Sequence, residues 1–245
     1  YADRLAQLPI ALIGVALNVV TLPKLSSLKK SGRLVEGNSY LNQSMQLSLV
    51  FALPASVGLI YLNFEIISSL FQRGNFSMND AVQTSKALSI YSLSIIPISL
   101  QLLLLNFYFA EKNIRVPFYY SLSSVFLNVS LAYSLLGMFE FLAPPIAYAI
   151  TNWLVFTSLV YHTYQYGFYF NKAFKRTLPR IVLSSCVMLI CLIFLKNTTI
   201  EYFFYKNLTV LWLGAVILIA GISYFACMKF LGILNKNFWT NEFNE

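Results

Sequence analysis

Seven long apolar runs, separated by short polar loops, constrain the fold of this chain more than any other feature of its sequence. Each is close to the roughly 20 apolar residues that an α-helix needs to cross a bilayer. Because backbone groups in lipid must form their hydrogen bonds within the segment, all seven are predicted to be helices. The sequence therefore predicts an all-α, polytopic transmembrane helix bundle of about seven spans. The runs are Leu5–Pro23, Leu47–Phe64, Ala87–Ala110, Val116–Met138, Phe141–Tyr161, Leu178–Leu195 and Leu208–Met228.

The composition indicates that lipid, not water, surrounds most of the chain. Of the 245 residues, 58% are hydrophobic and only 11% are charged, whereas a soluble domain has about 25% charged residues. One small globule could not hide so much apolar surface from water. The net charge of +8 would suggest nucleic acid as a partner of a soluble protein. Here the cations gather in loops between apolar runs, which is typical of a membrane topology signal.

The distribution of those cations predicts the orientation of the helices. Lys and Arg are concentrated around Lys29 and around Lys175, in two loops that an even number of predicted spans separates, whereas the loop around Glu140 carries only that acid. Cationic loops stay in the cytoplasm. The loops around Lys29 and Lys175 and the C-terminus are therefore predicted to be cytoplasmic, and Glu140 is predicted to face outward.

Three prolines, Pro9, Pro54 and Pro97, lie inside predicted spans. Proline lacks the N–H that would bond to the carbonyl four residues earlier, so each is predicted to bend its helix. Bent helices are common in transporters that rock between two states, and they are also common in other membrane bundles. In the loop after the second span, Gly74 is predicted to end a short helix.

The sequence has no arrangement of residues that is typical of an enzyme. It contains no Ser/His/Asp set, no paired acids inside a span, no glycine-rich phosphate loop and no cluster with metal-ligand spacing. Cys186, Cys191 and Cys227 lie in apolar runs and are interpreted as packing residues. We therefore expect no enzymatic activity, no metal and no cofactor.

Asp3 and Arg4 form the outstanding polar pair, because they stand at the mouth of the first span and a long uncharged run follows them. An arginine is costly in a membrane unless it faces a cavity or a partner, and its planar guanidinium can bind phosphate through two hydrogen bonds. Arg4 therefore has two interpretations. It is either a binding residue in a water-filled cavity or an interfacial arginine that snorkels or pairs with Asp3.

Four motifs in the first half of the chain resemble those of the MurJ/MviN family. Asn113 and Val116 depart from the last motif, where the family usually has Asp and Thr. The resemblance covers most of residues 1–120, and beyond them only the number of spans and the loop charges agree. The motifs are Tyr1-Ala2-Asp3-Arg4-Leu5 with Gln7-Leu8-Pro9 and Ile13-Gly14-Val15-Ala16-Leu17, then Ala52-Leu53-Pro54-Ala55, then Phe71-Gln72-Arg73-Gly74-Asn75-Phe76, and then Tyr108-Phe109-Ala110 with Arg115-Val116-Pro117.

Members of that family have fourteen helices in two lobes, and they move the peptidoglycan precursor lipid II from the inner to the outer leaflet of the bacterial inner membrane. The resemblance implies that this chain is the C-terminal half of such a two-lobed transporter. Its implied partners are lipid II, membrane lipids and the missing N-terminal half of the same protein, with no nucleic acid. It also implies that Arg4 is the family's essential cavity arginine and Asp3 its acidic neighbour, so both are candidate substrate-binding residues.

The resemblance further implies a division of the chain into two parts. Residues 1–165 would form five spans of the C-terminal lobe, and residues 166–245 would form the family's additional pair of helices. In the family, that pair is thought to line a groove for the polyprenyl tail. The candidate groove residues are Leu189, Ile193, Leu213 and Ile217.

Two other functions compete with lipid II flipping. Another exporter of the same superfamily, for an O-antigen-type lipid-linked oligosaccharide or a drug, would share the fold, but the motif around Asp3 and Arg4 favours the flippase. A membrane enzyme of polyprenyl-phosphate metabolism would need acids grouped at the membrane face. The nine acids of this chain are scattered, which argues against the enzyme.

Overall fold

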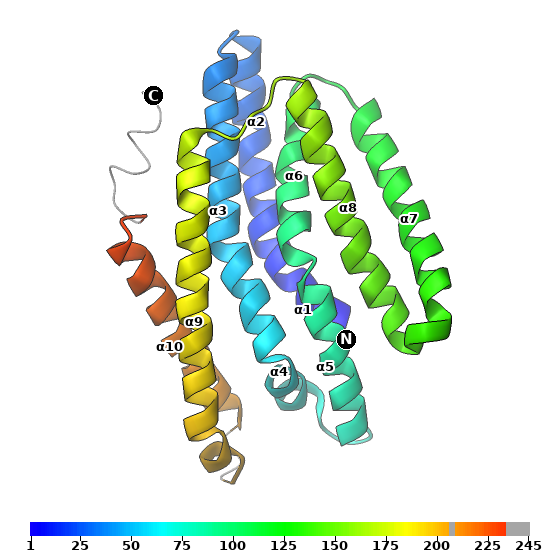
Figure 1. Cartoon of the computed structure of the whole chain (residues 1–245), viewed down its shortest axis with the longest axis vertical. Coiled ribbons are helices and arrows are strands. Elements are labelled where there is room, and N and C mark those ends of the chain that lie inside the picture. The colour runs from blue at the N-terminus through cyan, green and yellow to red at the C-terminus, as the bar shows by residue number, and fades with distance from the viewer. Residues whose placement is uncertain (206–208, 234–245) are drawn as a thin grey trace.

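The computed structural model describes residues 1–205 and 209–233, and this part of the chain is helical and contains no strand. Figure 1 shows the helices as a bundle that runs along the long axis of the molecule. The predicted all-α bundle is thereby confirmed. The elements are α1 (Ala2–Pro9), the π-helix η1 (Ile10–Val15), α2 (Ala16–Lys30), α3 (Leu34–Tyr61), α4 (Asn63–Phe71), α5 (Met78–Ser92), α6 (Ile95–Phe109), α7 (Arg115–Phe139), the short 3-10 turn η2 (Glu140–Leu142), α8 (Ala143–Gln165), α9 (Lys172–Tyr205) and α10 (Thr209–Phe230).

Six helical segments of the described chain are long and apolar enough to cross a membrane. One of them, Arg115–Gln165, has 51 residues and contains both α7 and α8. These two helices lie side by side and reverse direction at η2 (Figure 1), so the segment crosses twice. The chain is thus a multi-pass membrane protein with seven crossings, in agreement with the seven predicted spans. Leu208, with which the seventh predicted span begins, lies outside the described residues.

The helix boundaries differ from the predicted ones at two places. The second span was expected to begin at Leu47, but α3 already begins at Leu34 and continues through buried polar residues such as Asn38 and Asn42. The third span was expected to be one helix, but it is interrupted between α5 and α6, where Leu93 and Ser94 form a turn. Hydropathy alone misses both features, because it detects only the part of a helix that lies in the hydrocarbon.

The interruption before α6 follows from Pro97. Its ring nitrogen cannot donate to the carbonyl of Leu93, four residues earlier. The indole N–H of Trp153 on α8 donates to that carbonyl instead, at 3.1 Å. The predicted bend is therefore present, and a side chain from a neighbouring helix donates a hydrogen bond to the carbonyl oxygen that the proline leaves without a partner.

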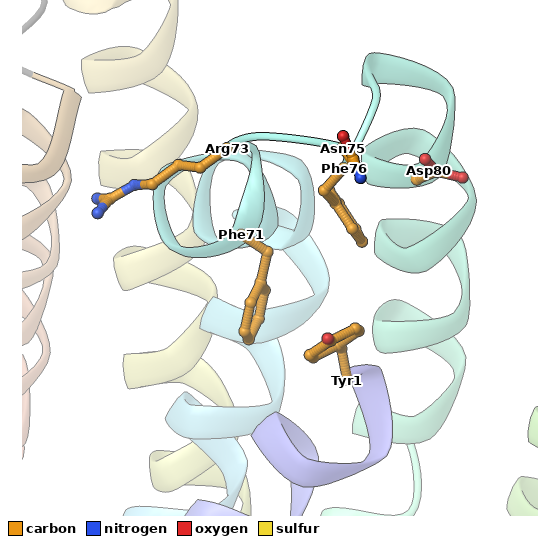
Figure 2. A pocket seen from close by; sticks show the side chains of 6 residues that line it. All are labelled: Tyr1, Phe71, Arg73, Asn75, Phe76 and Asp80. Atoms are coloured by element: carbon orange, nitrogen blue, oxygen red, sulfur yellow. The ribbon is translucent and has the colours of Figure 1, made fainter.

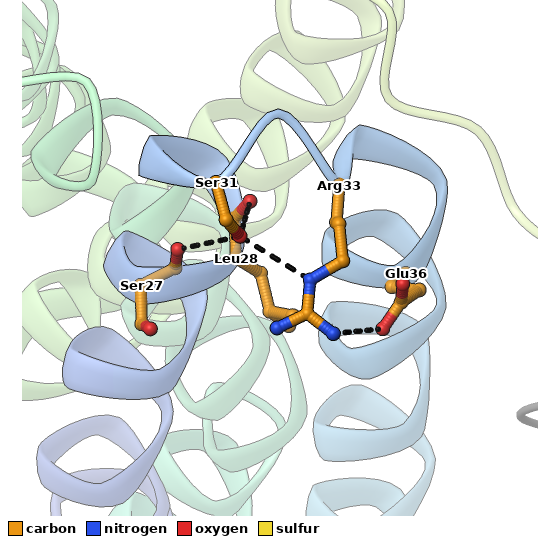
Figure 3. A network of polar contacts seen from close by, with 5 residues as sticks. All are labelled: Ser27, Leu28, Ser31, Arg33 and Glu36. Atoms are coloured by element: carbon orange, nitrogen blue, oxygen red, sulfur yellow. Dashed lines mark hydrogen bonds and ion pairs between the residues drawn. The ribbon is translucent and has the colours of Figure 1, made fainter.

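The turn between α2 and α3 is closed by its own polar side chains (Figure 3). Gly32 adopts a positive φ of 74°, which glycine tolerates. The Ser31 hydroxyl lies 3.1 Å from the Ser27 carbonyl oxygen and 3.0 Å from that of Leu28, and it accepts a bond from Arg33 Nε at 3.2 Å. Arg33 also bonds to Glu36, at 3.3 Å. The cation Arg33 thus stabilises the turn through its own hydrogen bonds.

The loops alternate between the two ends of the bundle as the charge pattern predicted. The α2–α3 turn and the α8–α9 connection lie at one end in Figure 1, and the α7–α8 turn with Glu140 lies at the opposite end. Lys29 is not free in solvent, because its ammonium group lies 2.6 Å from a Glu111 carboxylate oxygen and 3.4 Å from the centroid of the Phe107 ring. One predicted cytoplasmic cation therefore also joins α2 to the end of α6.

The connection to the last two helices is held by two buried asparagines of α3. Asn38 Nδ2 and Asn42 Nδ2 both donate to the carbonyl of Tyr169, at 3.0 and 2.9 Å, and their Oδ1 atoms accept from the backbone N–H groups of Tyr169 and Asn171, both at 3.3 Å. The two amides thus provide hydrogen-bond partners for backbone N–H and C=O groups that lie outside any helix. They fix the start of α9 against α3.

Candidate substrate site

The predicted site residues lie on α1, one face of which is buried while the opposite face is exposed. Ala2 and Ala6, one turn apart, are 6% and 3% exposed, and α1 packs against α5. Arg4 lies about 200° around the helix from Ala2, because successive residues are about 100° apart. The packing therefore turns Arg4 away from the bundle, and its side chain is exposed.

The beginning of α1 is held by an aromatic cluster that joins two of the motifs found in the sequence. The ring centroid of Tyr1 lies 4.8 Å from that of Phe71 and 5.9 Å from that of Phe76. Figure 2 shows the three rings converging, while Arg73 points away from them. Gly74 was predicted to end the short helix, but α4 ends at Phe71 with Gln72 as its C-cap, and Gly74, with a φ of 60°, lies in the turn that follows. The cluster borders an open hollow of about 390 Å³ and fixes the helix that carries Arg4.

Asp3 does not pair with Arg4, contrary to one interpretation of the sequence. Its Oδ2 accepts a hydrogen bond from Gln7 Nε2 at 2.6 Å, because residues four apart face each other on a helix whereas adjacent residues do not. Within the described chain, no hydrogen bond or ion pair involves the side chain of Arg4. The guanidinium therefore has all its donors available.

Asp3 belongs to a small polar group between α1, α5 and α8. Near Asp3, the rings of Tyr91 on α5 and Tyr148 on α8 meet edge to face, with centroids 5.6 Å apart. All three side chains are half-buried. The sequence did not reveal the two tyrosines, since they are far from Asp3 in the chain and each resembles an ordinary boundary aromatic.

The segment that follows Arg4 departs from α-helical geometry. Pro9 leads into η1, a six-residue π-helix, and such segments occur often at functional sites. Gly14 in η1 is buried, and a Cβ atom there would lie 3.1 Å from Leu102 Cδ1 and 3.4 Å from Ser99 Cα of α6. The absence of a side chain at Gly14 lets the two helices approach closely and fixes the direction of α1.

The four candidate groove residues differ in accessibility. Ile193 and Ile217 are 40% and 48% exposed, and Leu189 is half-buried. Leu213 is only 7% exposed and belongs to the hydrophobic core, so it supports the helix pair rather than lining an open surface. Among the described residues, no group of three His, Cys, Asp or Glu side chains could hold a metal ion.

The structure defines a multi-pass membrane helix bundle with an exposed, unpaired arginine at the head of its first span. The family model described as lipid II flippase MurJ matches residues 1–228. The chain therefore belongs to the MurJ family.

Curated relatives and a solved structure agree with this assignment. The chain is 26% identical over 238 residues to a probable lipid II flippase MurJ of Rickettsia prowazekii, covering 96% of this chain and 47% of that protein. It is 30% identical to one of Rhizobium tropici, covering 95% and 44%. A structure titled lipid II flippase MurJ, inward closed conformation, matches with a TM-score of 0.80 and 25% identity, over 94% of this chain and 46% of that one. The chain spans about half the length of the curated relatives that it matches.

Proposed function

We propose that this chain forms the C-terminal lobe of a lipid II flippase, which moves lipid II from the inner to the outer leaflet by alternating access. The observation that carries the proposal is the exposed, unpaired Arg4 on the uncovered face of α1, in a chain of the MurJ family. The partners are lipid II, membrane lipids and the N-terminal half of the same protein. Transport makes and breaks no covalent bond, so the protein is not an enzyme.

The chemistry of the substrate fits such a site. A pyrophosphate is anionic and cannot cross hydrocarbon unaided. A guanidinium in a water-filled cavity can hold it with two parallel hydrogen bonds, while the polyprenyl tail stays among apolar side chains. Asp3, bonded to Gln7, keeps the acid away from the guanidinium and so leaves Arg4 free for the anion.

We further propose that α9 and α10 receive the polyprenyl tail, with Ile193 and Ile217 as the accessible contacts and Leu189 beside them. A lipid II analogue with a photoreactive tail should crosslink to these helices in proteoliposomes, and unlabelled lipid II should reduce crosslinking several-fold. An O-antigen-type lipid should compete poorly, because its head group differs even though its tail is the same. Equal competition by both lipids would favour the rival exporter, and crosslinks confined to α1–α6 would exclude the groove.

The protein is proposed to lie in the bacterial inner membrane with the loops near Lys29 and Lys175 in the cytoplasm, and the C-terminus on the same side. The test uses three variants, each without Cys186, Cys191 and Cys227. Each variant carries one new cysteine, in place of Lys30, Lys175 or Glu140, all of which are exposed. An impermeant thiol reagent should label only position 140 in intact cells, and all three positions after permeabilisation. Labelling of position 30 or 175 in intact cells would reverse the orientation.

A further inference from the structure

The bend of α3 leaves a backbone carbonyl without its helical partner. Pro54 cannot donate to the carbonyl oxygen of Val50, four residues earlier. An open carbonyl in a membrane interior costs free energy, because no water is present to bond to it. The hydroxyl of Tyr224 on α10 donates to this oxygen at 2.7 Å.

Tyr224 is positioned for this bond by its surroundings. It is 1% exposed, and its ring lies against that of its neighbour Phe225, with centroids 5.3 Å apart. Next to it, the rings of Phe51 on α3 and Phe225 on α10 have centroids 6.3 Å apart. A single buried hydroxyl therefore joins α10, which packs along α9, to α3.

A directed bond at this place has a role that apolar packing cannot fill. Helices in lipid do not associate through the hydrophobic effect, because the lipid tails are as apolar as the side chains. Apart from Trp212 and Tyr224, the buried side chains of α10 are apolar, namely Leu213, Val216, Ala220 and Met228. Such a surface can slide or rotate with little change in energy, whereas the Tyr224 bond fits only one register.

Two other polar contacts attach the same helix pair at its ends. At one end, Asn38 and Asn42 hold the backbone before α9. At the other end, Lys196 of α9 forms an ion pair with Glu65 of α4 at 2.7 Å. Tyr224 meets α3 between these two points, where the proline has opened the backbone.

We propose that the Tyr224 hydroxyl is the group that positions the α9–α10 pair on α3. It does so by donating a hydrogen bond to the Val50 carbonyl oxygen, which Pro54 leaves without a helical partner. Its contribution is to fix the register of α10 against α3. The inference rests on the proposed function only in that this pair would hold the lipid tail.

The test is a double-mutant cycle in the full-length natural chain. Tyr224→Phe removes only the hydroxyl, so the midpoint of thermal unfolding in detergent should fall by about 2–4 °C. Pro54→Ala restores an N–H that can bond to the Val50 carbonyl. In the Pro54→Ala background, Tyr224→Phe should therefore lower the midpoint by less than about 1 °C. Tyr133→Phe is the matched control, because Tyr133 is 80% exposed and should show no change in either background.

A second measurement reports the register directly. Cysteines placed at Phe51 and Phe225, in a variant without the three natural cysteines, should crosslink efficiently, and Tyr224→Phe should slow this crosslinking several-fold. Equal destabilisation by Tyr224→Phe with and without Pro54 would overturn the proposal, and so would unchanged crosslinking. Neither readout uses lipid II, so these outcomes are independent of whether the protein flips it.

Discussion

Replacement of Arg4 by alanine is expected to abolish lipid II flipping while the protein remains folded and inserted. Arg4 is exposed and makes no contact that the fold requires, so its loss should leave the amount of protein unchanged. The substrate pyrophosphate would lose a charge-assisted pair of hydrogen bonds, which are about twice as strong as neutral ones. In cells depleted of their own flippase, the full-length natural chain should restore growth and Arg4→Ala should not.

Two further variants separate the roles of charge and shape at this position. Arg4→Lys keeps the positive charge but loses the planar fork, so it should rescue growth poorly if the guanidinium grips pyrophosphate with two bonds. Lys24→Ala is the matched control, because Lys24 is also exposed, near the other end of the same span, and its loss should have no effect. Asp3→Asn should be milder than Arg4→Ala, since Gln7 can still donate to the amide oxygen.

Normal growth of Arg4→Ala at normal protein level would show that Arg4 is only an interfacial anchor. Full rescue by Arg4→Lys would indicate that the site supplies positive potential without a bidentate grip. Protein level is measured by immunoblot, and folding by the elution profile in detergent.

The number of spans and the alternation of the loops could be predicted from the sequence, because both follow from the length of the apolar runs and the placement of Lys and Arg. The sequence around Gly37 also indicated a helix that runs on into the second span, but the burial of Asn38 and Asn42 in this polar part of α3 could not be predicted. Asn38 and Asn42 are buried there by partners about 130 residues away, and such partners leave no local pattern. The bond between Tyr224 and Val50, which joins residues 174 apart in the chain, was hidden for the same reason.

The helix that carries Asp3 and Arg4 was predicted correctly, whereas the pairing of their side chains, one of the two interpretations of Arg4, is wrong. The helical spacing of Asp3 and Gln7 could have indicated their bond, because residues four apart share a face. The neighbouring Tyr91 and Tyr148, and the π-helix from Ile10 to Val15, depend on how α1 packs against other helices. The close approach of η1 to α6 depends in turn on the absence of a side chain at Gly14.

Gly14→Val is expected to be the most damaging single change in the first span. The Cβ atom alone would lie 3.1 Å from Leu102 Cδ1, which can rotate away, and 3.4 Å from Ser99 Cα, which belongs to the backbone and cannot. The branched methyl groups of valine would then force η1 away from α6. Overpacking of this kind costs about 1–3 kcal/mol, so the midpoint of thermal unfolding should fall by roughly 4–10 °C.

The same displacement should reach the substrate site, because η1 sets the direction of the helix that carries Arg4. We therefore expect Gly14→Val to lose most of the flipping activity even in the protein that remains folded, and Gly14→Ala to have a smaller effect on both measurements. Gly58→Val is the matched control, since nothing lies within 4 Å of a Cβ atom at that position. Equal unfolding midpoints for the two valine variants would mean that η1 and α6 can separate without cost, and that Gly14 does not set the position of Arg4.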